Sequence, residues 1–200
     1  MFLGNYHLTH FVTSAPSVQH LPDDTGIEVA FIGHSNSGKS SALNALTNNK
    51  KLARTSKTPG STKLINLFKV STNYRLVDLP GYGYSYASQT IKIQWQNLII
   101  NYLTYRRSLI GLSILMDVRH PLKILDYQMI LLAIKNNIEV FILLTKADKL
   151  SNNINLIQLN KVRKDTKIFP KKINVELFSS KKKIGIDKLQ RQLNFWYQNF

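Results

Sequence analysis

The stretch GHSNSGKS, residues 33–40, constrains the fold of this chain more than any other feature. It matches the pattern G-x-x-x-x-G-K-S, follows the apolar run Ile27–Ile32 and precedes a helical pattern over Lys39–Thr47. Backbone N–H groups of such a loop wrap the phosphates of a nucleotide, and the helix that follows directs its positive end at them. We expect Lys39 to reach the β- and γ-phosphates and Ser40 to bind Mg²⁺. The alternative is an ordinary turn between a strand and a helix.

Short β-type runs alternate with amphipathic stretches, which is typical of a mostly parallel sheet with helices on both faces. The predicted strands are Ile27–Ile32, Lys63–Val70, Tyr74–Asp78, Leu109–Asp117, Glu139–Thr145 and Val175–Phe178. The predicted helices are Lys39–Thr47, Thr90–Tyr105, Leu122–Asn136, Asn153–Lys164 and one marked by Ile186, Leu189, Leu193 and Trp196. The tripeptide STN predicts a hairpin, so one strand of this six-stranded sheet runs antiparallel. The fold class is therefore α/β, with the phosphate loop of a P-loop NTPase.

The segment DLPG, Asp78–Gly81, ends the second strand of the predicted hairpin. An aspartate at the carboxyl end of a strand beside the phosphate loop can hold Mg²⁺ through a water molecule, and we expect Asp78 to do so. The N–H group of Gly81 would reach the γ-phosphate. A D-x-x-G pattern alone is a weak signal, but at the end of a strand after a phosphate loop it is a strong one.

The segment TKAD, Thr145–Asp148, selects the base. Guanine offers two adjacent donors, N1–H and the 2-amino group, and the carboxylate of Asp148 can accept both, whereas adenine would leave that carboxylate unpaired. Lys146 would lie along the plane of the base. Thr145 replaces the asparagine that commonly begins this pattern, and its hydroxyl can still tie the segment to the phosphate loop. The sequence FSS, residues 178–180, follows the last strand, and the N–H groups of its serines can meet guanine O6.

Two small polar segments have the composition of nucleotide-dependent switches. Arg54–Lys63 is rich in small residues, and a threonine within it would complete the coordination of Mg²⁺ in the triphosphate state. We expect Thr62 in this role in preference to Thr58, because Pro59-Gly60 sets a flexible turn just before it. The second switch is Gly81–Gln89, whose tyrosines lie either in the core or on a surface that faces a partner.

The charge of the chain is unusual. Lys and Arg total 27 against 11 Asp and Glu, which gives a formal net charge of +16 over 200 residues and a pI near 10.0. Such a surface attracts polyanions, and structured RNA is the obvious one. The basic tracts are NNKKLARTSK, KVRKDTK, FPKKI and SSKKK. The alternative is compositional drift, since Lys, Asn and Ile are the residues that an AT-rich genome favours.

The remaining composition suggests a protein of the cytoplasm. The chain has no cysteine, which suits a reducing compartment and excludes disulfides and thiolate zinc sites. No apolar run reaches the roughly 18 residues of a membrane span. The start of the chain lacks the basic and apolar blocks of a secretory signal. The histidines lie at no spacing typical of a metal site, and we expect His34 to face solvent.

The ordered motifs GHSNSGKS, KTPGST, DLPGYGY, DVRHP, TKAD and FSS resemble those of the YihA/EngB/YsxC family of bacterial Ras-like GTPases. DLPGYGY and DVRHP (Asp117–Pro121) are the most telling, and the opening SAP…LPDDTGIEVAF and Trp95 also match. The resemblance runs from about Phe11 to Trp196. It implies a Ras-like G domain, which we place at residues 25–200, with residues 1–24 as an N-terminal extension packed on it.

The resemblance also implies a ligand set and a cellular role. The ligands are GTP or GDP with Mg²⁺, and the role is assembly of the large ribosomal subunit, needed for normal cell division and septation. The residues expected to line the nucleotide are Gly33, His34, Ser35, Asn36, Ser37, Gly38, Lys39, Ser40, Gly60, Ser61, Thr62, Lys63, Leu64, Asp78, Leu79, Pro80, Gly81, Thr145, Lys146, Ala147, Asp148, Phe178, Ser179 and Ser180. Ser40 and Thr62 would bind the magnesium directly and Asp78 through water, while Lys39, Thr62 and Gly81 would act on the γ-phosphate. Leu64 can contribute only its backbone.

Hydrolysis of GTP is expected to be slow. Many Ras-like proteins have, just after D-x-x-G, a glutamine that orients the attacking water, and here that position is Tyr82. Arg54 and Arg119 are candidates for an internal arginine finger. Asn36 stands where several relatives in the superfamily hold a potassium ion, whose charge could replace a finger. The alternative is that Asn36 only braces the loop.

Two other classes of function remain open at this level. One is a protein-binding switch of the division machinery with no direct contact to the ribosome, in which the basic charge is incidental. The other is a kinase or ATPase that uses the same phosphate loop, which TKAD argues against. We expect a monomer, since no exposed coiled-coil pattern is present, and no binding to DNA.

Overall fold

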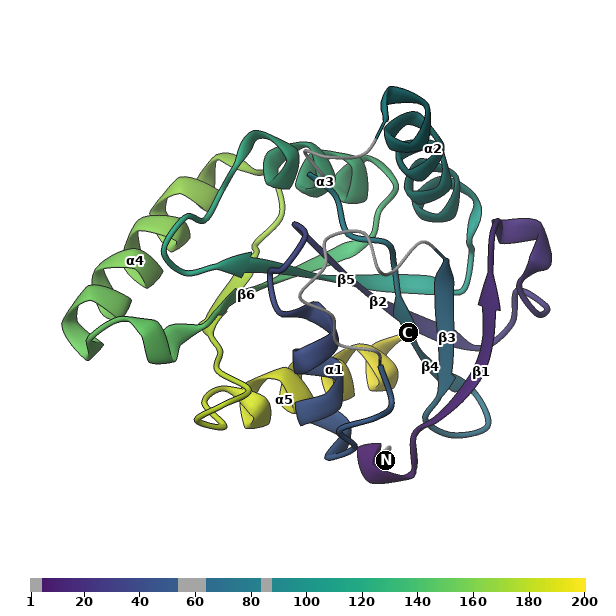
Figure 1. Cartoon of the computed structure of the whole chain (residues 1–200), viewed down its shortest axis with the longest axis horizontal. Helices are drawn as coiled ribbons and strands as arrows, with labels where there is room; N and C mark the ends of the chain where they lie inside the picture. The colour runs from purple at the N-terminus through teal and green to yellow at the C-terminus, as the bar shows by residue number, and fades with distance from the viewer. Residues whose placement is uncertain (1–4, 54–63, 84–87) are drawn as a thin grey trace.

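The computed structural model describes residues 5–53, 64–83 and 88–200 of the chain. Their strands form one seven-stranded sheet with the order β1-β3-β4-β2-β5-β6-β7 (Figure 1). In chain order the strands are β1 (His10–Ala15), β2 (Ile27–Gly33), β3 (Ile65–Lys69), β4 (Tyr74–Asp78), β5 (Leu109–Asp117), β6 (Glu139–Thr145) and β7 (Asn174–Leu177). Within this described sheet β3 pairs antiparallel with both β1 and β4 and all other pairs are parallel, so β3 alone runs against the rest.

The described sheet confirms the predicted α/β class and its single reversed strand, but it has seven strands where six were predicted. The missed strand is β1, at the edge beside β3. Phe11 and Val12 in β1 are 52% and 41% exposed, so its apolar residues do not alternate with polar ones in the way that marks a half-buried strand. The N-terminal segment thus adds an edge strand to the sheet, and a domain boundary at residue 24 stays a prediction.

Helices cover both faces of the sheet, with α2 and α3 above it and α1 and α5 below it in Figure 1. The α-helices of the described residues are α1 (Lys39–Thr47), α2 (Gln89–Tyr105), α3 (Ile124–Lys135), α4 (Asn152–Asp165) and α5 (Ile186–Asn199). Successive residues of β2 serve the two layers, because Ala30 and Ile32 pack with α2, α3 and α4 while Val29 and Phe31 pack with α1 and α5. The predicted helices are confirmed with ends within about two residues.

Local side chains set several helix starts. Ser88 and Ser151 cap α2 and α4, each accepting a hydrogen bond from a backbone N–H three residues later. At α3 the carboxylate of Asp126 reaches back and accepts the N–H of Lys123 at 2.8 Å. Among the described residues no helix has the length and apolar character to span a membrane.

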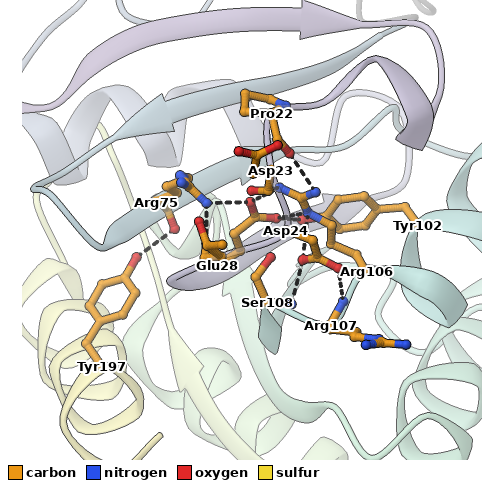
Figure 2. Close-up of polar contacts among 11 residues, drawn as sticks. Pro22, Asp23, Asp24, Glu28, Arg75, Tyr102, Arg106, Arg107, Ser108 and Tyr197 are labelled. Atoms are coloured by element: carbon orange, nitrogen blue, oxygen red, sulfur yellow. Dashed lines mark hydrogen bonds and ion pairs between the residues drawn. The ribbon is translucent and has the colours of Figure 1, made fainter.

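The amino ends of the central strands hold a buried charge cluster around Glu28, shown in Figure 2. Glu28, in β2, is fully buried. Its Oε1 accepts from Nη2 of Arg106 at 2.7 Å, and its Oε2 accepts from Nε of Arg106 at 3.0 Å and from the hydroxyl of Tyr102 at 2.7 Å. Arg106 also donates to the carbonyl of Pro22 at 2.9 Å, so this one cluster joins the N-terminal segment, the end of α2 and β2.

Asp24 strengthens the same junction. Its carboxylate accepts the backbone N–H groups of Arg107 and Ser108, each at 2.8 Å, and also pairs with Arg106. These bonds keep the pKa of Asp24 below its ordinary value, although partial burial alone would raise it. The connection between α2 and β5 is therefore fixed at the amino edge, on the side of the sheet opposite to the phosphate loop.

Candidate nucleotide-binding site

The phosphate loop joins β2 to α1 at the carboxyl edge of the sheet. Gly38, immediately before α1, has a φ of 93°, in the left-handed region that favours glycine. Gly33 has no room for a side chain, because a Cβ there would lie 2.4 Å from the carbonyl oxygen of Leu115 and 2.5 Å from the hydroxyl of Ser37. Both glycines of the sequence pattern are therefore required by the path of the backbone.

Lys39 and Asp78 meet at the centre of this loop. The ammonium group of Lys39 forms an ion pair with Oδ1 of Asp78, and the two residues are only 8% and 2% exposed. The sheet brings them together, because Asp78 pairs with Phe31 in the parallel β2–β4 ladder and the N–H of Leu79 donates to the carbonyl of Phe31 at 3.0 Å. The predicted phosphate-binding lysine and the predicted magnesium-binding aspartate thus lie side by side.

The groups around this pair suit a magnesium nucleotide. Ser40 lies half-buried in the first turn of α1, whose N–H groups have no partner within the helix. The hydroxyl of Ser37 is buried and has no hydrogen-bond partner among the described residues. A carboxylate, hydroxyls and an ammonium group around one glycine loop are the donor set that Mg²⁺ and phosphate oxygens require.

Thr145 links the base-binding segment to the phosphate loop. Its Oγ1 lies 2.5 Å from the carbonyl oxygen of Ser37 and 3.0 Å from that of Met116, so one hydroxyl is shared between two acceptors. Thr145 is buried, at the carboxyl end of β6. The predicted tie from a threonine, in the position where asparagine is common, is confirmed.

Asp148 is held by the last of the predicted motifs. The hydroxyl of Ser179 donates to Oδ1 of Asp148 at 2.5 Å, and this hydrogen bond is the main reason why the pKa of Asp148 lies below its ordinary value. The N–H of Ala147 donates to the carbonyl of Phe178 at 3.1 Å, so TKAD and FSS adjoin. An ionised carboxylate in this position offers guanine the acceptor that its two donors need.

Asp117, at the carboxyl end of β5, forms ion pairs with Lys146 of TKAD and with Arg119. Lys146, with a φ of 60°, places its Nζ 3.0 Å from Oδ2 of Asp117. The guanidinium of Arg119 is bidentate on the same carboxylate, at 2.9 Å from Nε and 2.6 Å from Nη2. Partial burial would raise the pKa of Asp117, but the bonds from Arg119 and Lys146 outweigh it and hold that pKa well below its usual range.

Comparison with known proteins identifies the family. A family model described as a 50S ribosome-binding GTPase matches residues 28–146. The probable GTP-binding protein EngB of Klebsiella pneumoniae (strain 342) is 60% identical over 193 residues, which cover 96% of this chain and 92% of that protein. Its counterpart from Haemophilus influenzae (strain PittEE) is 58% identical and covers 96% and 94%. The chain belongs to the EngB family.

Solved structures agree on the fold of this EngB-family GTPase, which binds GTP and GDP. A crystal structure of a probable GTP-binding protein engB has a TM-score of 0.70 at 20% identity, covering 86% of this chain and 100% of that one. The structure of Aquifex aeolicus Era bound to GDP.AlF4- has a TM-score of 0.68 at 18% identity, covering 86% and 57%. The predicted Ras-like GTPase fold is therefore confirmed.

Two buried asparagines that the sequence interpretation missed tie helices of this EngB-family protein to nearby segments: Asn44 holds the segment after α1, and Asn155 holds TKAD. Asn44, on the buried side of α1, accepts the N–H of Ala53 at 2.8 Å and donates to the carbonyls of Ala53 at 2.9 Å and Lys50 at 3.0 Å. Asn155, in α4, donates to the carbonyl of Ala147 at 2.8 Å and so holds the backbone of TKAD itself. The signal available in the sequence was an asparagine at a buried helical position.

Tyr82, which follows DLPG, lies in the core. It is 7% exposed and its hydroxyl donates to Oδ1 of Asp126 at the start of α3. Burial first, and then the neighbouring carboxylate, raises the pKa of Tyr82 well above its ordinary value. Its backbone also pairs with the phosphate loop, since its carbonyl accepts the N–H of Ser35 at 2.8 Å and its N–H donates to Gly33 at 3.2 Å. Of the two alternatives for the tyrosines, the core is correct for this one.

The expectation that His34 faces solvent is wrong. The ring of His34 is half-buried and lies edge-on to Tyr82, with 6.0 Å between ring centroids. A Cβ at Gly83 would lie 2.1 Å from Nε2 of His34, so the ring packs over this glycine. The reason is that the phosphate loop and the segment after DLPG run side by side as a parallel bridge.

The other predicted site residues divide into three groups. Gly60, Ser61, Thr62 and Lys63 lie outside the described residues, as do the rest of the first switch from Arg54 and residues 84–87 of the second. Leu79, Pro80 and Gly81 are buried beside the phosphate loop, and Ser180 is half-buried after Ser179. Asn36 and Leu64 are exposed, and Asn36 has a φ of 61°.

Proposed function

We propose that this GTPase is an assembly factor of the large ribosomal subunit and that its GTP-bound form docks on the RNA of that subunit. Normal cell division and septation would depend on this step. The observation that supports the proposal most is the excess of 27 Lys and Arg over 11 acidic residues in a guanine-nucleotide-binding protein, since such a charge favours a polyanionic partner. The description of the matching family model, which names 50S ribosome binding, agrees with it.

The proposed site binds GTP along the carboxyl edge of the sheet. Asp148 would accept the two donors of guanine, Lys146 would cover the base, and the loop at residues 33–40 would wrap the phosphates. Lys39 would neutralise the β- and γ-phosphates, and the N–H of Gly81 would bind the γ-phosphate. Mg²⁺, held by Ser40 and Thr62 and through water by Asp78, would neutralise charge on the phosphate oxygens. We place the protein in the cytoplasm as a monomer.

We further propose that intrinsic hydrolysis is slow, on the order of 10⁻⁴–10⁻² s⁻¹. The side chain of Tyr82 is directed to Asp126 in the core, so it is not placed to orient a water molecule at the γ-phosphate. Arg119 is engaged by the carboxylate of Asp117 beside the base segment, which argues against a role as an internal arginine finger. Faster turnover would then need a group from outside the chain.

Potassium is the candidate for that group. Asn36 is exposed in the phosphate loop, where an ion held by its side-chain oxygen would add positive charge near the phosphates. GTP hydrolysis should be faster in potassium than in sodium buffer, with and without ribosomal subunits, and Asn36→Ala should abolish the difference. Equal rates in the two buffers would leave Asn36 with a bracing role only.

The test of the proposed function is co-sedimentation with purified large ribosomal subunits, in GDP and in a non-hydrolysable GTP analogue, over a series of salt concentrations. Tighter binding with the analogue, falling steeply with salt, would support docking on RNA. Lys39→Met, as the control, should sediment equally in both nucleotides. Binding that is absent or indifferent to the nucleotide would contradict the proposal, and a shallow salt dependence would favour a protein partner in the division machinery.

A further inference from the structure

A basic groove lies at the amino edge of the sheet, away from the nucleotide. It has a volume of about 480 Å³ and is formed by the end of α4, the turn η4 (Thr166–Ile168) and the start of β7. Its charged lining residues are Arg163, Lys167, Lys171, Lys172 and Glu176. In the β6–β7 ladder, Asn174 in this groove pairs with Phe141, whereas the guanine segment begins after Leu177 at the other end of the strand. The groove and the nucleotide site thus occupy opposite edges.

The lining carboxylate Glu176 and the nearby Glu139 are each paired with a cation, and Asp165, beside the lining residue Thr166, is in none of the described ion pairs. Glu176 pairs with Arg163 at 3.0 Å and also with Lys188, which lies outside the lining. Glu139 pairs with Lys171 at 3.3 Å.

Two lining cations remain without a counter-charge. Lys167 and Lys172 are exposed, and within the described part of the chain no acidic group lies at ion-pair distance from either. The flanking helix adds Lys161 and Lys164, so the stretch 161–172 contains six basic residues and one acid. Held close together, these cations repel one another, and a bound polyanion would relieve that repulsion.

The lining indicates which polyanion fits. Lysines are depleted in protein–protein interfaces, which use aromatic and arginine anchors, so this groove has the wrong composition for an acidic protein. Its aromatic residue, Phe169, is 9% exposed and packs on Tyr127 with ring centroids 6.0 Å apart, so it offers no surface on which an unpaired base could stack. Single strands are held by such stacking, whereas duplex RNA is held through its backbone phosphates.

We infer that this groove, between α4 and β7, binds the phosphate backbone of double-helical RNA without regard to its sequence or to the nucleotide state of the protein. The inference rests on the proposed RNA partner and adds a second contact surface to it. Lys167 and Lys172 supply the main contacts, as flexible point charges that fit phosphates in more than one geometry. The groove would hold the protein on RNA in either nucleotide state, while binding at the carboxyl edge would depend on whether GTP or GDP is bound.

The experiment uses the full chain with an RNA duplex of roughly 16 base pairs, the span of a typical duplex-binding domain, and measures fluorescence anisotropy from about 50 to 200 mM salt. Lys167→Ala/Lys172→Ala should weaken binding roughly 10- to 50-fold and reduce the slope of log affinity against log salt by about 2, equally in GDP and GTP analogue. The control Lys123→Ala/Lys135→Ala removes the same charge from two exposed lysines outside the basic tracts and should change neither value as much. Unchanged thermal midpoints and GTP affinities would show that both proteins are intact.

Three outcomes would overturn the inference that the groove binds duplex RNA. These outcomes are an equal loss of affinity in the groove variant and its control, binding of single-stranded RNA of equal length as tight as that of the duplex, and a loss of polyglutamate binding in the groove variant as large as its loss of RNA binding. Co-sedimentation of the groove variant with ribosomal subunits separates this inference from the proposed function. If the variant binds like the wild type and still prefers the GTP analogue, only the groove is wrong; if the wild type binds neither duplex nor subunits, the proposed RNA partner fails as well.

Discussion

Buried charged side chains have different numbers of hydrogen-bond partners at the two edges of the sheet. At the amino edge, the carboxylate of Glu28 has bonds from Arg106, Tyr102 and, at 3.4 Å, Arg75, and Arg106 in turn donates to the carbonyl of Pro22 (Figure 2). At the carboxyl edge, Lys39 and Asp78 are nearly as buried, but within the described part of the chain their side chains have only each other as a hydrogen-bonding partner.

The two buried ion pairs differ in how fully their hydrogen-bonding groups are satisfied within the protein. A buried ion pair stabilises a protein only when hydrogen bonds satisfy its remaining donors and acceptors, and the Glu28 cluster meets that condition from within the chain. The Lys39–Asp78 pair has no such further partners among the described residues, as its proposed role in binding the phosphates and Mg²⁺ of a nucleotide requires. Both clusters are buried and charged. They differ in the number of hydrogen-bond partners that the described residues supply, which is larger for the Glu28 cluster than for the Lys39–Asp78 pair.

The largest effect on stability is expected at the amino edge. Glu28→Leu should lower the free energy of unfolding by about 3–5 kcal/mol, because it removes the buried carboxylate and leaves the guanidinium of Arg106 with only the partly exposed Asp24 as a counter-charge. Chemical denaturation measures this loss. The control Glu139→Leu removes a partner of Lys171 whose side chain is 34% exposed, and it should cost less than about 1 kcal/mol. The GTP affinity of folded Glu28→Leu should stay within about threefold of the wild type. A loss as large as that expected below for Lys39→Met/Asp78→Asn would contradict the distinction between the two ion pairs.

The next effect is expected from the double variant Lys39→Met/Asp78→Asn. Replacing both partners leaves no unpaired buried charge, so the free energy of unfolding without nucleotide should change by about 1 kcal/mol or less. GTP affinity should fall at least roughly 100-fold, about 3 kcal/mol, because the phosphates lose their cation. Calorimetry with GTP and denaturation without it measure the two quantities. A protein as destabilised as Glu28→Leu would show that this pair is a structural anchor too.

A smaller change in affinity is expected from Asp148→Asn. An amide presents guanine with a donor where it needs an acceptor, so GTP affinity should fall roughly 30- to 100-fold, while xanthosine triphosphate, which replaces the 2-amino group by a carbonyl, should bind better. Competition binding with the two nucleotides measures the preference. The exposed carboxylate of Asp187 offers the control Asp187→Asn, which should leave it unchanged. If base preference does not move in Asp148→Asn, the base is bound elsewhere.

The smallest expected effect concerns pH. The pKa of Asp117 is lowered in the folded protein, so its ion pairs stabilise the fold above the ordinary carboxyl pKa of about 3.9, and that contribution is lost as the pH falls toward the lower folded value. The difference in thermal midpoint between wild type and Asp117→Asn should therefore be constant near neutral pH and shrink below about pH 4. Circular dichroism over this range measures it, and a difference that grows on acidification would contradict the assignment.

The sequence was sufficient where one local rule dominated. The glycines at 33 and 38, the apolar strands and the motifs DLPG and TKAD predicted the layers of the fold and the edge that holds the candidate site, because several local patterns in one order support the same arrangement. β1 escaped prediction because its pairing with β3 comes from a segment over 50 residues away, and its exposed Phe11 and Val12 hide the alternation.

Contacts between distant segments were also invisible in the sequence. Nothing local directs Tyr82 to Asp126, which lies 44 residues further along the chain, since this bond depends on how α3 packs on the sheet. The same is true of Glu28, which in the sequence is one acid at the start of an apolar run. The partners of a buried polar group are a property of the assembled fold.

The most direct test of this comparison is a crystal structure of the chain with Mg²⁺ and a non-hydrolysable GTP analogue. The account predicts that Nζ of Lys39 contacts phosphate oxygens, that the hydroxyl of Ser37 gains a partner, and that the bonds of Glu28 to Arg106 and Tyr102 stay as they are. A nucleotide bound elsewhere, with Lys39 still paired only to Asp78, would contradict it.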